Sequence, residues 1–196
     1  YLPYSGDQAD CGRIKEFMEM LTKARLALDI CFVRTTDYGY SLDMNLNEDN
    51  ASLKRLMMLQ SMYFVSSSLY TNWRWFNWLM NQVRNGIPDV DSMFESLKVM
   101  VNKEELPKYE DLAYPAEIRF WFWKLDFYIW ENRAEIFKGK EKELQIAENY
   151  VFKRNRSIEH IAPQTPQSGS DMEWDESNDK DKKLCNSFGN LAMISQ

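Results

Sequence analysis

The runs RSIEHIAPQTP at residues 156–166 and SFGNLAMIS at residues 187–195 carry the most informative pattern in this chain. Ser157 to Ile161 and Leu191 to Ile194 are short apolar segments next to polar turns, which is typical of strands. The first segment contains His160, the single histidine among 196 residues. Histidine alone has an ordinary pKa near neutrality, so His160 is the one candidate for chemistry that needs an imidazole base.

Two further residues, Glu159 and Asn190, suggest which reaction such a base would catalyse. Glu159 offers carboxylate oxygens, which suit a divalent ion such as Mg²⁺. Adjacent strand residues point to opposite faces, so Glu159 and His160 share one centre only if the strand ends there, as Pro163 favours. Asn190 can hold the imidazole or its loop by a side-chain hydrogen bond. The set suits metal-assisted cleavage of a phosphodiester, although a lone histidine in an apolar strand is more often a core residue.

A short basic run precedes the histidine. Lys153, Arg154 and Arg156 place positive charge where a phosphate backbone would approach His160. The whole chain carries a net charge of −6, which argues against a surface coated with nucleic-acid-binding residues but not against a local strip. A solvated turn explains the run equally well.

The rest of the chain is predicted to be mainly α-helical. Apolar residues recur at three- and four-residue steps, and they predict helices whose ranges are 11–33, 51–66, 70–85, 90–101, Pro115 to about Phe137, and 140–148. Residues 37–48 lose this period and predict a loop, whereas 150–152 predict a strand and 178–187 a short helix. We therefore expect a helical bundle over residues 1–148 and a small mixed α/β element over residues 149–196.

The composition gives no sign of secretion or membrane insertion. Ile118 to Trp130 is the most apolar stretch, but charged residues interrupt it and it is too short to span a bilayer. Three widely separated cysteines favour neither a zinc site nor a disulfide framework. Cys31 lies on the apolar face of a predicted helix and is expected in the core. These features predict a cytoplasmic protein without a membrane partner, and the first residue, Tyr1, suggests a piece of a longer chain.

The succession SIEHIAPQTP, Trp174 and SFGNLAMIS resembles the HNH (ββα-metal) nuclease domain at the C-terminal end of GmrSD-type restriction endonucleases. These are modification-dependent enzymes that cleave foreign DNA. The resemblance is specific over residues 157–195 and looser over the preceding helices. It implies that His160 is the general base, that Glu159 binds the catalytic Mg²⁺ or Mn²⁺, and that Asn190 orients the histidine and its loop.

The resemblance also predicts what this chain lacks. The third signature position of the family, an Asn or His on the helix after the GNL strand, is expected beyond residue 196. Residues 149–196 would then form a partial ββα-metal (HNH-like) element that binds metal weakly, with little or no activity of its own, whereas the parent protein would be an endonuclease. The implied partners are DNA, modified or not, and an N-terminal ParB-like domain of the parent chain.

Two alternatives stay open at this level. The first is a helical protein–protein interaction module whose last hairpin is a non-catalytic nuclease remnant. The second concerns the substrate, because a metal and a base act on an RNA backbone as readily as on a DNA backbone.

Overall fold

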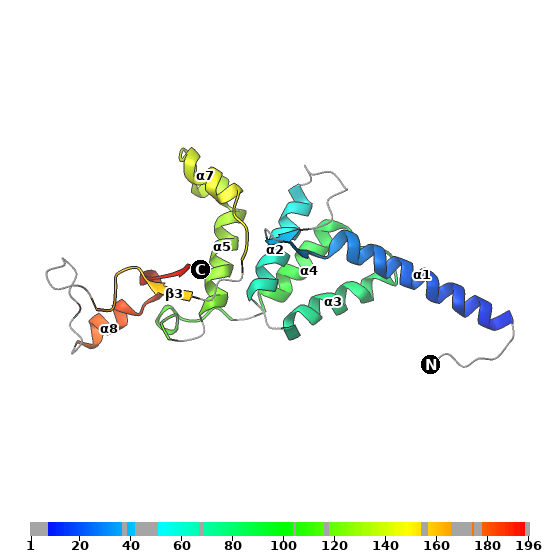
Figure 1. The fold of residues 1–196 in the computed structure, drawn as a ribbon, viewed down its shortest axis with the longest axis horizontal. Coiled ribbons are helices and arrows are strands. Elements are labelled where there is room, and N and C mark those ends of the chain that lie inside the picture. Colours follow the sequence, from blue (N-terminus) through cyan, green and yellow to red (C-terminus); the bar gives the residue numbers. More distant parts are fainter. Residues whose placement is uncertain are drawn as a thin grey trace. The chain divides into compact units, whose positions relative to one another are not determined.

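A computed structural model describes residues 8–36, 39–41, 51–66, 69–103, 105–115, 118–153, 157–165, 174 and 178–194. They form eight α-helices and two antiparallel two-stranded sheets, so the predicted mainly α fold with a small C-terminal hairpin is confirmed (Figure 1). By packing, the chain divides into two compact units, Tyr1–Val101 and Asn102–Gln196. The predicted division between residues 148 and 149 stays a prediction.

Four helices build the first unit: α1 (Gln8–Cys31), α2 (Ala51–Ser66), α3 (Leu69–Val83) and α4 (Val90–Val101). Helix α2 packs against α4, and α1 packs against α3 (Figure 1). Asp89 caps α4 as its side chain suggests, because its Oδ1 accepts a hydrogen bond of 2.9 Å from the amide of Ser92. Gly86 follows α3 with φ of 129°, a conformation that side chains other than glycine rarely adopt.

A buried glutamine joins three parts of the first unit. Gln60 is fully buried on α2, where its Nε2 donates to the carbonyl of Cys31 at 2.8 Å. Its Oε1 accepts from the amide of Val33 at 3.3 Å and from Nε1 of Trp75 at 3.1 Å. The glutamine thus satisfies backbone groups at the end of α1. Cys31 itself is buried, which confirms its predicted place in the core.

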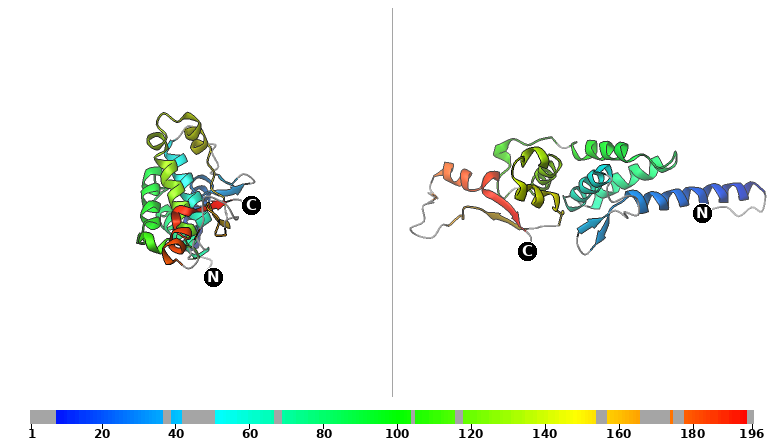
Figure 2. Two further views of the ribbon diagram at one scale, coloured as in Figure 1. Left: turned by 90° about the vertical axis from the view of Figure 1, so that its left-hand side faces the viewer. Right: turned by 90° about the horizontal axis from the view of Figure 1, so that it is seen from above.

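A small hairpin follows α1. Strands β1 (Arg34–Thr36) and β2 (Gly39–Ser41) pair antiparallel, with Thr35 opposite Tyr40 (Figure 2). The predicted loop over residues 37–48 is therefore wrong at residues 39–41. A strand of three residues is too short for an alternating pattern to reveal it in the sequence.

Three helices form most of the second unit: α5 (Arg119–Glu131), α6 (Arg133–Ile136) and α7 (Glu141–Glu148). The prediction of one helix from Pro115 to about residue 137 is wrong at both its start and its middle. Asn132 is the C-terminal cap of α5: its backbone amide makes the usual helical hydrogen bond to the carbonyl of Tyr128 at 3.1 Å, and its Nδ2 donates to the same carbonyl at 2.9 Å. Side chains that compete for backbone carbonyls in this way end helices.

The predicted strand at residues 150–152 is also wrong. These residues form no strand, although Phe152 is fully buried and the ring of Tyr150 meets it edge to face at 5.0 Å. Their apolar character therefore reflects packing rather than pairing in a sheet.

The C-terminal hairpin comes from two distant segments. Strand β3 (Ser157–His160) pairs antiparallel with β4 (Leu191–Ile194), and helix α8 (Asp179–Cys185) lies between them in the sequence (Figure 1). The 3₁₀ helix η2 (Phe188–Asn190) leads directly into β4, and a second, η1 (Tyr109–Asp111), precedes α5. Both strands and α8 agree with the sequence prediction.

The hairpin shares its core with α5. Leu191 is buried with Ile118 and Phe122, and the ring of Phe188 stacks on that of Phe122 with centroids 4.2 Å apart. Alternate residues of a strand face the same side, so His160 shares a face with Ile158, which packs against this core. Among the described segments, no helix is long and apolar enough to cross a bilayer.

Candidate active site around His160

His160 is half-buried at the end of β3, opposite Leu191 of β4. Its Nε2 lies 3.0 Å from Oδ1 of Asn186. The ring of Tyr114 meets the imidazole edge to face, with centroids 5.3 Å apart and planes at 75°. The histidine is therefore neither sealed in apolar surroundings nor free to rotate.

The orientation of the Asn186 amide decides which nitrogen of His160 carries a proton. Nδ2 of Asn186 donates to the carbonyl of Lys182 at 3.1 Å, so its Oδ1 must face the imidazole. An amide oxygen accepts hydrogen bonds, and Nε2 of a neutral His160 is therefore the protonated nitrogen. Nδ1 keeps its lone pair, and no described residue donates a hydrogen bond to it.

Asn186 is a residue that the sequence analysis missed. It is the C-terminal cap of α8, and its carbonyl accepts a hydrogen bond of 2.9 Å from the amide of Tyr114. Nε2 of Gln164 also donates to its Oδ1, at 3.1 Å. An asparagine four residues before Asn190, at the end of a predicted helix, was a signal for a cap, but nothing in the sequence linked it to His160.

Asn190 binds the loop that follows the histidine. Its Oδ1 accepts from the amide of Ala162 at 2.8 Å, and its Nδ2 donates to the carbonyls of Ala162 at 3.1 Å and Cys185 at 2.7 Å. Its backbone carbonyl accepts from the amide of Ile161 at 2.8 Å. The side chain thus joins the loop after β3 to the end of α8, and the described contacts connect it to the histidine through that loop.

Gly189 precedes Asn190 at a point of close approach. A Cβ at this position would lie 3.2 Å from Oη of Tyr109, which is tighter than most contacts of this kind. The glycine therefore lets η1 and η2 pack closely, and it does so without a positive φ.

Glu159 lies on the other face of β3 from His160. It is exposed and pairs with Ala192, whereas His160 faces Tyr114. No hydrogen bond or ion pair involves the Glu159 carboxylate within the part of the chain that the structure describes. The carboxylate is therefore accessible to a cation from solvent.

The donor set fits a divalent metal only in part. Within the described ranges, no three His, Cys, Asp or Glu side chains lie close enough to hold an ion together. Burial raises the pKa of the Cys185 thiol, which disfavours the thiolate that a metal would need. Glu159 alone would leave most positions around a Mg²⁺ to water.

Of the three residues in the predicted basic run, the structure describes one, Lys153. Lys153 is exposed four residues before β3 begins at Ser157, and Arg154 and Arg156 lie outside the described residues. The site as described consists of the imidazole, its amide partner, the loop fixed by Asn190 and the exposed carboxylate of Glu159.

Comparison with known families finds a similarity for the second unit. Residues 103–196 match the family model of GmrSD restriction endonucleases, C-terminal domain. The matched segment coincides with the second compact unit, so the resemblance inferred from the hairpin is confirmed and extends back through α5–α7. This half of the chain is therefore similar to the C-terminal domain of GmrSD restriction endonucleases. No match was found among curated proteins or among solved structures.

Proposed function

We propose that this chain is part of a DNA endonuclease of the restriction type in which His160 is the general base. The observation that carries the proposal is the arrangement of the imidazole, with Nε2 held 3.0 Å from the Asn186 oxygen and Nδ1 without a described partner. The match of residues 103–196 to a restriction endonuclease family favours DNA over RNA as the substrate.

His160 would act through Nδ1. A neutral imidazole that donates from Nε2 to Asn186 presents the Nδ1 lone pair to a water molecule, which loses its proton as its oxygen attacks the scissile phosphorus. The resulting imidazolium keeps its hydrogen bond to the Asn186 oxygen, and this bond strengthens when the donor is charged. Tyr114 and Asn186 would hold the ring in one orientation throughout.

The remaining roles rest on the family resemblance. Asn190 would position the loop after β3, and Glu159 would provide one carboxylate ligand for Mg²⁺ or Mn²⁺. A bound divalent ion supplies positive charge to the phosphate and the leaving oxygen. Lys153, Arg154 and Arg156 would contact the DNA backbone as positive charges.

The tautomer of His160 tests the proposal without an activity assay. Because the chain has one histidine, a nitrogen NMR spectrum of imidazole-labelled protein reports this ring alone. We expect the neutral form to carry its proton on Nε2, and we expect Asn186→Ala to give a mixture of tautomers. Asn149→Ala is a matched control, because Asn149 caps α7 and donates to the carbonyl of Gln145 at 2.9 Å without touching the histidine.

DNA cleavage tests the catalytic role itself. In a supercoiled-plasmid nicking assay of the parent protein with Mg²⁺ or Mn²⁺, His160→Ala should lower the rate by roughly 10²–10⁴-fold, the usual contribution of a general base. Asn149→Ala should leave it unchanged. Nicking by His160→Ala at the wild-type rate would rule out the proposed base.

One observation favours the alternative of an interaction module. Helix α1 exposes several large apolar side chains, among them Ile14, Phe17, Met18 and Leu21, each about half exposed (54%, 47%, 53% and 50%). Such contiguous apolar surface is typical of protein contacts. A parent protein that binds a partner through α1 but never nicks DNA would favour this reading over the nuclease.

A further inference from the structure

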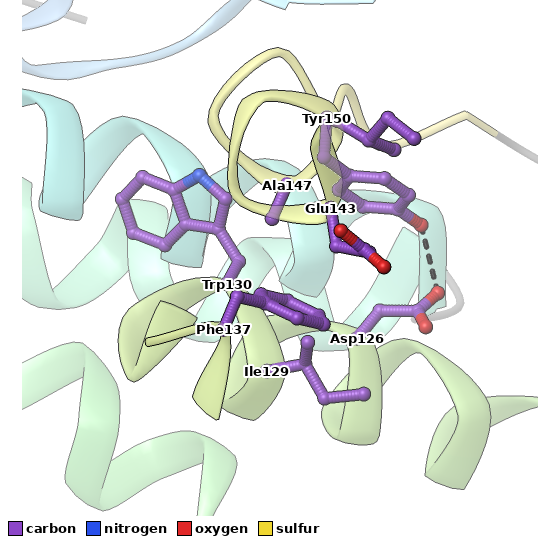
Figure 3. A pocket seen from close by; sticks show the side chains of 8 residues that line it. Asp126, Ile129, Trp130, Phe137, Glu143, Ala147 and Tyr150 are labelled. Atoms are coloured by element: carbon purple, nitrogen blue, oxygen red, sulfur yellow. Dashed lines mark hydrogen bonds between the residues drawn. The ribbon is translucent and has the colours of Figure 1, made fainter. Parts of the chain in front are cut away.

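A cavity in the second unit lies away from the hairpin. It has a volume of about 260 Å³ and opens between α5, the turn after α6, and α7 (Figure 3). Its walls are formed by Asp126, Ile129, Trp130, Phe137, Glu143, Ile146, Ala147 and Tyr150. None of these residues belongs to the site around His160.

The walls are apolar and aromatic. Trp130, Phe137 and Tyr150 contribute the aromatic side chains, and Ile129 lies below Phe137 in the view of Figure 3. A cavity of about 150 Å³ with apolar walls accommodates benzene, so this larger space has room for a ring with a short side chain. The volume of the cavity therefore suits fragment-sized organic molecules.

Two carboxylates give the cavity its charge. Oδ2 of Asp126 accepts a hydrogen bond of 2.7 Å from Oη of Tyr150, and no other described residue bonds to this carboxylate. The Glu143 carboxylate points into the same space beside Asp126 (Figure 3). Among the described residues no basic side chain lines the cavity, so its walls carry two acids without a basic partner.

The environment of Asp126 shows that a countercharge would be favourable. Burial raises the pKa of the Asp126 carboxyl, and the hydrogen bond from Tyr150 opposes this only in part. Burial and the neighbouring carboxylate also raise the pKa of Tyr150, which keeps its phenol protonated as a donor. A partly buried carboxylate without a cation is costly, and a bound cation offsets that cost.

We propose that this cavity binds a small organic cation with an aromatic body, of the arylalkylamine class. The ammonium group would pair with Asp126 and Glu143, and the ring would pack against Trp130 and Phe137. Aromatic walls also attract the cation directly through their π faces. The proposal is independent of the nuclease function, because it involves no residue of the His160 site.

Calorimetric titration with 2-phenylethylamine tests the proposal. We expect saturable binding to the whole chain, at least about tenfold tighter than that of the neutral 2-phenylethanol, and none with phenylacetate, because charge-assisted hydrogen bonds are the stronger ones. Equal affinity for the amine and the alcohol would reject cation recognition. Absence of amine binding at millimolar concentration would reject the site.

Variants locate the binding. Asp126→Asn retains the size of the side chain and removes its charge. It should weaken the binding of 2-phenylethylamine by about tenfold or more. Glu135→Gln removes the same charge from an exposed position on α6 outside the cavity and should change the affinity less than about twofold. Circular dichroism establishes that each variant is folded.

A second variant covers the case in which Asp126→Asn does not fold. Glu143→Gln alters an exposed residue of α7 and should weaken the binding of 2-phenylethylamine by roughly two- to fivefold. The effect is smaller because solvent screens the Glu143 carboxylate better than that of Asp126. Unchanged affinity in a folded Asp126→Asn variant, or in Glu143→Gln when the first is unfolded, would overturn the proposal.

Discussion

Asn190 joins the loop after β3 to the end of α8 through three side-chain hydrogen bonds, and Asn190→Ala removes all of them. Each bond is worth about 1 kcal/mol net, so the loop should lose about 3 kcal/mol of stability. Ala162 is 8% exposed, and its amide would lose its acceptor in a place that water reaches poorly. The loss of loop stability should therefore be about 3 kcal/mol or more.

Hydrogen exchange measures this loss at the residues concerned. The amides of Ile161 and Ala162 should become about 100-fold less protected in Asn190→Ala, because each 1.4 kcal/mol is a factor of ten. Asn149→Ala, which removes one exposed side-chain bond on α7, should leave these two amides unchanged. A change of less than about fivefold, near 1 kcal/mol, would refute the claim that Asn190 fixes the loop.

Three further perturbations test other parts of the fold. Asp89→Ala removes the acceptor of the Ser92 amide and should destabilise α4, measured as a lower midpoint in urea. Gly189→Ala places a Cβ 3.2 Å from Oη of Tyr109, so it should lower the Tm. Tyr109→Phe in the same protein removes this oxygen and should restore most of the lost Tm. A Tm that is not restored would exclude this contact as the cause. Burial raises the pKa of the Cys31 thiol to about 11, so alkylation at pH 8 should be far slower for Cys31 than for an exposed thiol, as mass spectrometry of the labelled peptides would show.

The sequence was sufficient for elements whose pattern is long and local. Helix α2 begins and ends at the predicted residues 51 and 66, and β3 and β4 lie within one residue of prediction. Apolar spacing determines these elements because the same residues that form them also face the core.

The sequence failed where a side chain or a distant partner decides the outcome. Asn132 ends α5 by competing for the Tyr128 carbonyl, although the apolar spacing continues past it. Strand β2 exists because it pairs with β1, and its three residues carry no pattern of their own. Phe152 looked like a strand residue but is buried in coil.

The candidate site divides in the same way. The sequence by itself determined that His160 is the one imidazole of the chain, that it ends a short strand, and that Glu159 takes the other face. Only the tertiary structure decided that Asn186, 26 residues further along, is the partner of the imidazole and that Asn190 binds the loop instead. The physical reason is that strand periodicity fixes the face of a side chain locally, whereas a hydrogen bond between side chains depends on where the end of α8 comes to lie.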